Sequence, residues 1–152
     1  MRIAVGSDHR GYNLKEEVKR TLIELGHEPV DFGCRDTTSV DYPDYAEAVA
    51  RAVAARECEL GVLVCGTGIG MSITANKAPG VRAAVCHDGF TASRARQHND
   101  ANVLCLGADV LGTPLALEVL NAYLSASFEG GRHVRRVDKI TSLESRPGAR
   151  GQ

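Results

Sequence analysis

The sequence predicts an α/β fold in which a five-stranded parallel sheet is covered by helices on both faces. Short apolar runs of β type alternate along the chain with longer stretches in which apolar residues recur at helical spacing. Repetition of strand followed by helix is typical of parallel sheets buried on both faces. The chain has 152 residues, of which 43% are apolar and 24% charged, so one domain with a sizeable core is expected.

The expected strands are the apolar runs Ile3–Val5, Pro29–Phe32, Leu60–Cys65, Arg82–Cys86 and Val103–Leu106. Helical spacing predicts helices over Asn13–Leu25, Asp44–Arg56, Met71–Lys77, Phe90–Gln97 and Pro114–Ser127. Gly11 and Gly26 bracket the first helix, and Pro43 and Pro114 stand at first turns, where proline is tolerated. We expect the domain to span residues 1–140, with a flexible tail over residues 141–152.

Charge and hydropathy narrow the classes of function. The formal net charge of −1 gives no general reason to expect nucleic acid as a partner. The longest apolar runs, such as Leu60–Cys65, are too short to span a bilayer, so no membrane partner is expected. The N-terminus begins with a strand-like run rather than a signal-peptide hydrophobic stretch, which predicts a cytoplasmic protein.

The cysteines give no sign of a disulfide framework or a zinc site. There are five, an odd number, widely spaced and without a C-x-x-C pair: Cys34, Cys58, Cys65, Cys86 and Cys105. Most are expected to be small core residues. We expect no cofactor and no metal.

Cys65 differs from the other cysteines because it ends an apolar strand and begins a glycine-rich turn, V-C-G-T-G-I-G-M-S, over residues 64–72. Glycines allow backbone N–H groups to face an oxyanion or phosphate, and the partial positive charge at a helix start favours a thiolate. The turn therefore predicts a base beside oxyanion donors. The alternative is a tight strand-to-helix turn with a buried structural cysteine.

Ligands of open α/β sheets collect beyond the carboxyl ends of the strands. The polar residues expected at that edge are Ser7, Asp8, His9, Cys65, Thr67, His87, Asp88 and Asp109. His98 and Asn99 follow a helix and lead into the last strand, so they are expected at the opposite edge. A dimer in which His98 reaches a neighbour's Cys65 would resolve this conflict.

Each candidate also has a structural interpretation. Asp8 is equally suited to capping the following helix, and His9 to a solvated loop. His98 is suited to the cation that satisfies a helix C-terminus, and on the residues alone we favour that role slightly over catalysis. Tyr42 in D-Y-P-D-Y is typical of a packed turn aromatic.

The segment G-G-R-H-V-R-R-V-D-K, residues 130–139, concentrates basic residues in a slightly acidic chain. Such a run is usually solvated surface. If the stretch is helical, however, Arg132 and Arg136 share one face and can together bind a phosphate.

Five segments in this order resemble the ribose/galactose sugar-phosphate isomerase family. They are G-S-D-H-R-G-Y-N-L-K, D-Y-P-D-Y, C-G-T-G-I-G-M-S-I-T-A-N-K, R-Q-H-N-D-A-N and F-E-G-G-R-H-V-R-R-V. The resemblance implies metal-free interconversion of ribose 5-phosphate and ribulose 5-phosphate by a homodimer with a three-layer Rossmann-like fold and shared active sites. Pairing of dimers into tetramers stays open.

The resemblance also implies roles for individual residues. Cys65 is the base, and His98 with Thr67 opens the furanose ring. The anion hole comprises backbone N–H groups of Gly66, Thr67, Gly68, Ile69 and Gly70. The sugar is held by Asp8, Asn99 and Tyr42. The phosphate is held by His9, Arg132 and Arg136.

One departure from the family concerns Asp109, which stands in G-A-D where many members have an arginine that contributes to phosphate binding. A carboxylate about 4 Å from a phosphate charge costs about 1 kcal/mol in water and about 4 kcal/mol at an effective dielectric of 20. Either Asp109 points away or the ligand end differs. We expect phosphate affinity to depend on Arg132 and Arg136 and to be weaker than usual.

Other functions stay open at this point. The departure leaves room for a six-carbon aldose phosphate of the allose or galactose 6-phosphate type. A nucleotide- or flavin-binding module is disfavoured, because G-T-G-I-G-M-S is not G-x-G-x-x-G and lacks the lysine of a P-loop. A thiol-redox role lacks a resolving cysteine near Cys65 in the sequence, and a non-catalytic partner subunit would not need Cys65, Thr67 and His98 together.

Overall fold

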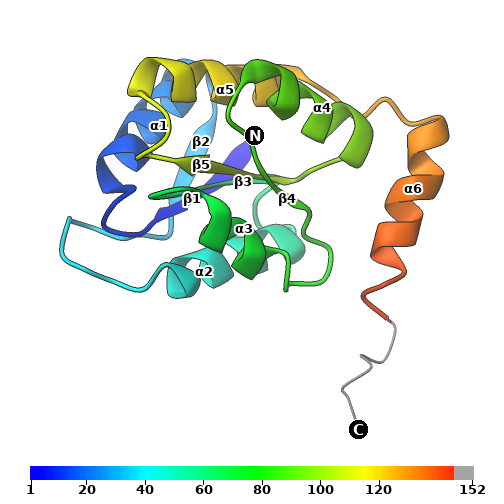
Figure 1. Cartoon of the computed structure of the whole chain (residues 1–152), viewed down its shortest axis with the longest axis horizontal. Coiled ribbons are helices and arrows are strands. Elements are labelled where there is room, and N and C mark those ends of the chain that lie inside the picture. Colours follow the sequence, from blue (N-terminus) through cyan, green and yellow to red (C-terminus); the bar gives the residue numbers. More distant parts are fainter. Residues whose placement is uncertain (146–152) are drawn as a thin grey trace, which may run out of the picture.

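The computed structural model describes residues 1–145, which form three layers around a parallel sheet (Figure 1). The strands are β1 (Arg2–Ser7), β2 (Glu28–Asp31), β3 (Leu60–Cys65), β4 (Ala83–Val85) and β5 (Val103–Gly107). Neighbouring strands are parallel, in the order β2-β1-β3-β5-β4. The predicted five-stranded, Rossmann-like α/β fold is confirmed.

Helices cover both faces of this sheet. They are α1 (Tyr12–Glu24), α2 (Tyr42–Ala54), α3 (Ile69–Ala75), α4 (Gly89–Asn99), α5 (Thr113–Ser125) and α6 (Arg132–Thr141). α1, α4 and α5 pack on one face and α2 and α3 on the other, while α6 stands beside α4, outside the layers (Figure 1). No helix within residues 1–145 is long and apolar enough to cross a membrane.

The central strand β3 shows how the layers orient the site. Val62 and Val64 belong to the apolar cluster under α1, α4 and α5, whereas Leu63 and Cys65 belong to the cluster under α2 and α3. Successive side chains of a strand point to opposite faces, and here both faces are buried, so the strand is a continuous apolar run. Cys65 therefore ends β3 with its side chain toward α3.

Most element boundaries differ from the predicted ones by one or two residues, and β3 agrees with its prediction. α2 begins at Tyr42 because Pro43 occupies the first helical turn. The stretch after Gly131 is helical, as the phosphate-binding interpretation of Arg132 and Arg136 requires. Beyond α6, Glu144 accepts a hydrogen bond from the Gly80 N–H at 2.9 Å. Residues 146–152 of the expected tail lie outside the described residues.

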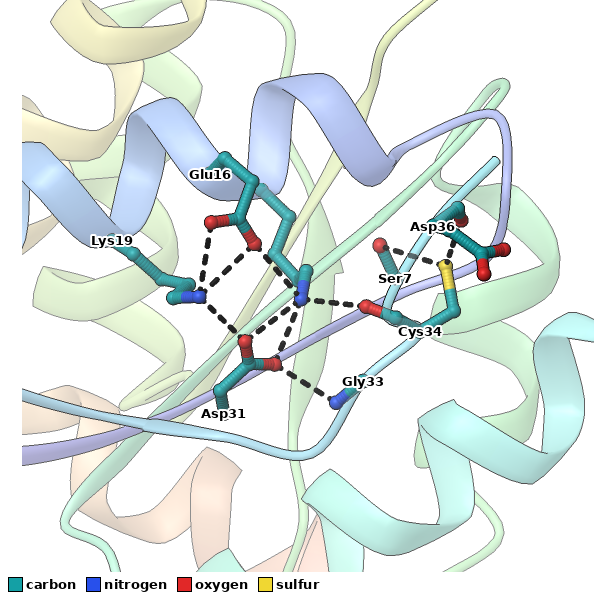
Figure 2. Close-up of polar contacts among 8 residues, drawn as sticks. Ser7, Glu16, Lys19, Asp31, Gly33, Cys34 and Asp36 are labelled. Carbon is teal, nitrogen blue, oxygen red and sulfur yellow. Dashed lines mark hydrogen bonds and ion pairs between the residues drawn. The ribbon is translucent and has the colours of Figure 1, made fainter. Parts of the chain in front are cut away.

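A group of ion pairs around the buried Lys15 side chain ties α1 to β2 and to the loop that follows it. The Lys15 ammonium donates to both carboxylate oxygens of Asp31, at 2.8 and 2.9 Å, and to the Cys34 carbonyl at 2.8 Å. Lys19 and the Gly33 N–H also donate to Asp31 (Figure 2). We call Lys15, Glu16, Lys19, Asp31 and Cys34 the structural cluster. It holds the start of the loop that leads to α2.

The structural cluster is saturated with hydrogen bonds. Burial by itself would raise the pKa of the Asp31 carboxyl, but hydrogen bonds from Lys15, Lys19 and the Gly33 N–H outweigh it, so this pKa lies below its ordinary value. The Lys15 side chain is only 1% exposed. The Lys15 charge is compensated by the carboxylates and the carbonyl around it. We therefore assign the structural cluster a role in stability.

Candidate active site

Residues 66–68 join β3 to α3, and we call these residues together with the first two of α3, that is residues 66–70, the glycine loop. Gly68 has a φ of 78°, in the left-handed region that favours glycine, and this conformation turns the chain into α3. The Gly68 N–H donates to the Cys65 sulfur at 3.1 Å. The loop thus directs a backbone hydrogen-bond donor at the sulfur that ends β3.

The backbone carbonyls around the glycine loop point toward the segment after β5, whereas its N–H groups do not. The carbonyls of Cys65 and Gly66 accept hydrogen bonds from the N–H groups of Ala108 and Asp109, at 2.8 and 2.9 Å. The first N–H groups of α3 have no acceptor within the helix. With carbonyls turned toward the segment after β5, these N–H groups remain to meet an anion, although the Ile69 N–H also reaches the Thr67 hydroxyl at 3.3 Å.

The other cysteines are core residues, as the sequence predicts for most of them. All five lie buried within the described chain, without disulfides. Burial raises the pKa of the Cys86 thiol to about 11 and that of Cys105 well above its ordinary range. Both are therefore protonated near neutral pH. Cys65 is distinguished by the backbone donor at its sulfur and by its place at the end of β3.

Asp8 lies at the turn between β1 and α1. Its Oδ1 accepts hydrogen bonds from the N–H groups of Arg10 and Gly11, each at 3.0 Å. The carboxylate thus holds the turn into α1, which is close to the capping role considered from sequence. Asp8 is 5% exposed, and its other carboxylate oxygen takes no part in these two bonds.

His9 and Tyr42 are tied to the same edge of the sheet. His9 is not a free solvated residue, because its Nδ1 accepts the Val40 N–H at 3.2 Å. Tyr42 packs directly on the glycine loop, where a Cβ added to Gly70 would lie 2.6 Å from atoms of the Tyr42 ring. Tyr42 as a whole is 40% exposed, so the loop covers it only in part.

Asp109 is engaged by a residue that the sequence analysis did not single out. Arg10 donates through Nε and Nη2 to Asp109 Oδ2, the Nε contact being 2.8 Å. Both side chains lie against Gly66, where an added Cβ would be 2.7 Å from Asp109 Oδ2 and 3.0 Å from Arg10 Nε. The carboxylate does not stand alone at the ligand edge but forms an ion pair there.

His98 and Asn99 lie at the opposite end of the sheet, as the sequence predicts. Cys65 is in register with Gly107, whereas Val103, the first residue of β5, pairs with Gly61. Four residues of strand separate these two levels by about 13 Å. His98 precedes Val103 at the far level, so a single chain does not bring it to Cys65 and Thr67.

His98 faces α6 rather than the end of its own helix. The carbonyls around the C-terminus of α4 are bound by arginines: Arg82 Nε donates to the Asp100 carbonyl at 2.9 Å, and Arg96 Nη1 to the Ala101 carbonyl at 2.9 Å. Two cations thus already perform the capping role considered for His98. The structure favours another role for His98.

Three side chains surround the His98 ring. The His133 ring stacks on it with centroids 4.1 Å apart and planes 12° from parallel. Glu129 Oε2 lies 3.7 Å from Nε2 of each histidine. Arg94 Nη1 is 3.3 Å from His98 Nε2. A guanidinium can only donate, so in this contact His98 Nε2 is the acceptor.

The group His98, Glu129 and His133 brings three possible metal ligands together. Imidazole lone pairs lie in the ring planes, and these planes are nearly parallel, so the two lone pairs do not converge on one ion. Burial, together with the neighbouring His98 and Arg132, lowers the pKa of His133. The arrangement is better suited to hydrogen bonding than to a metal.

Arg132 and Arg136 lie one turn apart at the start of α6. Neither forms a side-chain hydrogen bond or ion pair with another residue of 1–145. Two unpaired guanidinium groups on one helical face can bind a phosphate.

Comparison with known proteins decides the family. A profile described as ribose/galactose isomerase matches residues 3–140. Ribose-5-phosphate isomerase B of Escherichia coli is 49% identical over 145 residues, which cover 95% of this chain and 97% of the relative. The chain belongs to the ribose/galactose isomerase family.

Solved structures of this family agree with the fold. The Clostridium thermocellum ribose-5-phosphate isomerase B superposes with a TM-score of 0.94 at 52% identity, covering 95% of this chain and 97% of the other. The Mycoplasma genitalium enzyme, described with bound ribulose-5-phosphate, has a TM-score of 0.92 at 40% identity, covering 96% and 97%. The prediction of an aldose-ketose isomerase is confirmed at the level of this family.

Within this isomerase chain, the sequence analysis missed four side chains next to site candidates: Arg10, Arg94, Glu129 and His133. His133 follows Arg132 in the basic segment and lies four residues after Glu129, a spacing that could have signalled the pair. Arg10 directly follows His9, but its partner Asp109 is 99 residues away in sequence. No local pattern indicates such a contact.

Proposed function

We propose that this protein interconverts ribose 5-phosphate and ribulose 5-phosphate. The names of its relatives support this reaction, and one solved relative, from Mycoplasma genitalium, is described with ribulose-5-phosphate bound. The observation that carries the proposal is the Cys65 sulfur, held at 3.1 Å by the Gly68 N–H at the start of the glycine loop.

The chemistry assigned to this loop is proton transfer through an enediolate. The Cys65 thiolate removes the proton from C2 of the open-chain aldose, and the electron pair moves into a C1–C2 double bond as the carbonyl oxygen gains negative charge. Backbone N–H groups of Gly66, Thr67, Ile69 and Gly70 stabilise that oxygen, while the Gly68 N–H stays on the Cys65 sulfur. The thiol then returns a proton to C1, while a proton passes from O2 to O1.

The substrate is held from both ends. Asp8 and Tyr42, together with Asn99 of the partner subunit, contact the sugar. His98 of the partner subunit, assisted by Thr67, opens the furanose ring by moving a proton between the anomeric hydroxyl and the ring oxygen, because only the open chain carries a carbonyl. His9, with Arg132 and Arg136 of the partner subunit, binds the phosphate.

A homodimer follows from the position of His98. Cys65 and His98 lie at opposite ends of the sheet, so a site that uses both needs two chains. Ile69 and Ile73, one turn apart on α3 beside the glycine loop, are 53% and 59% exposed. Apolar side chains exposed next to an incomplete site are typical of a surface covered by a partner.

The experiment is a subunit-mixing assay. Cys65→Ala and His98→Asn proteins are each expected to be inactive on ribose 5-phosphate in the presence of EDTA. Mixed under conditions that exchange subunits, they should recover up to about one quarter of wild-type activity, because half of the dimers are mixed and each carries one intact site. No recovery despite exchange, verified by mass, would contradict shared sites. The same mass measurement distinguishes dimers from tetramers.

A panel of six-carbon aldose phosphates tests substrate size in the same assay. Wild-type turnover of allose or galactose 6-phosphate with no turnover of ribose 5-phosphate would refute the pentose assignment. Full activity of Cys65→Ala would remove the thiol from the mechanism.

A further inference from the structure

The Arg10–Asp109 ion pair lies on the first residue of the glycine loop. Gly66 has only hydrogen where another residue would have Cβ, and both side chains use that space: Asp109 Oδ2 and Arg10 Nε would lie 2.7 and 3.0 Å from an added Cβ. The guanidinium is therefore packed against the first residue of the glycine loop.

The main-chain N–H groups of Arg10 and Asp109 are both hydrogen-bonded, which fixes the backbone at each residue of the pair. The Arg10 N–H donates to Asp8 Oδ1 at 3.0 Å, and the Asp109 N–H donates to the Gly66 carbonyl at 2.9 Å. The backbone of Arg10 is thus fixed by the turn before α1, and its guanidinium is held by a carboxylate on the segment after β5. The ion pair therefore favours side-chain conformers of Arg10 that keep the guanidinium at the loop.

The pair does not use all the donors of Arg10. A guanidinium has five N–H donors, and Nε and Nη2 direct two of them to Asp109. The Nη1 edge meets no hydrogen-bond acceptor among residues 1–145. The Arg10 and Asp109 side chains are 59% and 46% exposed, so this edge is open to solvent.

We infer that Arg10 binds the phosphate of the substrate through its open edge, with Asp109 as the residue that orients it. The inference rests on the proposed function and assigns one more residue to that site. Charge explains the choice of ligand: the carboxylate is matched by the guanidinium, so it no longer repels a phosphate as an isolated Asp109 would. Geometry favours phosphate as well, because the paired N–H groups of a planar guanidinium can bind two phosphate oxygens at once.

The test compares four proteins: wild type, Arg10→Gln, Asp109→Asn and the double variant Arg10→Gln/Asp109→Asn. For each, KM and kcat are measured with ribose 5-phosphate, together with competitive inhibition by inorganic phosphate. We expect Arg10→Gln to raise KM and the phosphate inhibition constant about tenfold, with kcat within about twofold. Asp109→Asn keeps the guanidinium but loses its orientation, so a change of about threefold or less is expected.

The double variant separates two explanations. If Arg10 binds phosphate, removing both charges leaves KM and the inhibition constant about tenfold above wild type. If Arg10 only screens Asp109, the double variant returns to wild-type values, and the inference is wrong. Arg20→Gln is the matched control, since Arg20 forms an exposed pair with Glu17 on α1, 2.9 Å long and away from the loop. It should change neither constant.

Failure of the inference is distinguishable from failure of the proposed function. Wild-type turnover of ribose 5-phosphate tests the function alone. Inorganic phosphate is also titrated into wild type and Arg10→Gln and followed by amide chemical shifts, with no turnover required. Equal phosphate affinity of the two proteins would overturn the role of Arg10, whatever the enzyme assay shows.

Discussion

Arg10 and Lys15 are near neighbours in sequence, yet their ion pairs belong to different kinds of region. The Lys15 ammonium is 1% exposed and is surrounded by Asp31, Glu16 and the Cys34 carbonyl. The Arg10 guanidinium is 59% exposed, and its outer edge meets no acceptor in residues 1–145. The Lys15 ammonium is surrounded by acceptors within the protein, whereas the Arg10 guanidinium keeps N–H donors for a ligand.

The difference shows how to tell a structural charge from a functional one. In the structural cluster, removing a partner leaves a charge poorly solvated, so its contribution is to stability. At the candidate site, which comprises Cys65, the glycine loop, Arg10 and Asp109, polar groups are held in position before the substrate binds. Their contribution is therefore to binding and catalysis. Substitutions in the two regions should therefore separate activity from stability.

The largest expected effect is on activity at the glycine loop. Cys65→Ala should lower kcat for ribose 5-phosphate about 10³-fold, equivalent to about 4 kcal/mol of transition-state stabilisation, because a general base is removed. The free energy of unfolding should change by about 1 kcal/mol or less. Steady-state kinetics and urea unfolding measure the two quantities.

Cys86→Ala is the control for this prediction. Burial raises the pKa of Cys86 to about 11, so its thiol is protonated at neutral pH and is not expected to act in proton transfer. A comparable loss of kcat in both variants would mean that small changes of packing, and not the thiolate of Cys65, account for the effect.

The next effect is on stability in the structural cluster. Lys15→Met removes the ammonium and should lower the free energy of unfolding by about 2 kcal/mol. The loss is smaller than for a fully buried pair, because Asp31 keeps its bond from Lys19 and is 31% exposed. Urea unfolding measures it, and kcat of the folded protein should remain within about twofold.

Arg20→Met on the same helix is the matched exposed pair for this variant. It should cost about 0.5 kcal/mol or less, since exposed ion pairs contribute little. If Lys15→Met kept full stability but lost activity, the distinction between the two regions would be broken.

The sequence predicted the sheet and the loop well because their signals are local. β3 is a continuous apolar run that ends at Cys65, and the glycines that follow it require a turn, so both could be read without tertiary contacts. The Arg10–Asp109 pair and the stack of His98 on His133 join residues far apart in the chain. Their geometry depends on how strands and helices pack, which residue spacing does not encode.

Acid should weaken the structural cluster by a smaller amount. Burial alone would raise the pKa of Asp31, but the bonds from Lys15 and Lys19 lower it overall. A carboxyl whose pKa is lower in the folded state stabilises the protein above its unfolded pKa, and this stability is lost as the pH falls through the folded value. We expect a loss of about 1 kcal/mol below pH 4, allowing for partial exposure. Urea midpoints at pH 7 and pH 3 should differ less in Asp31→Asn than in wild type.

The smallest effect concerns the stacked histidines beside α6. Burial lowers the pKa of His133, and His98, Arg132 and Arg136 lower it further, while Glu129 opposes them. Neutral His133 is thus favoured, and its stabilising contribution, present above the ordinary histidine range near 6.5, is lost as the pH falls through the folded value. In His98→Asn, NMR titration should show a higher His133 pKa, because a stacked ring that can carry positive charge is gone.

His27 provides the internal control for that titration. His27 contacts the N-terminal amine, 3.5 Å away, and shares no contact with the stack, so the His98→Asn substitution should leave its resonance unchanged. An unchanged His133 titration would mean that the two rings are not electrostatically coupled. The stack would then be a packing contact alone, and its place among the ligand-facing groups would have to be given up.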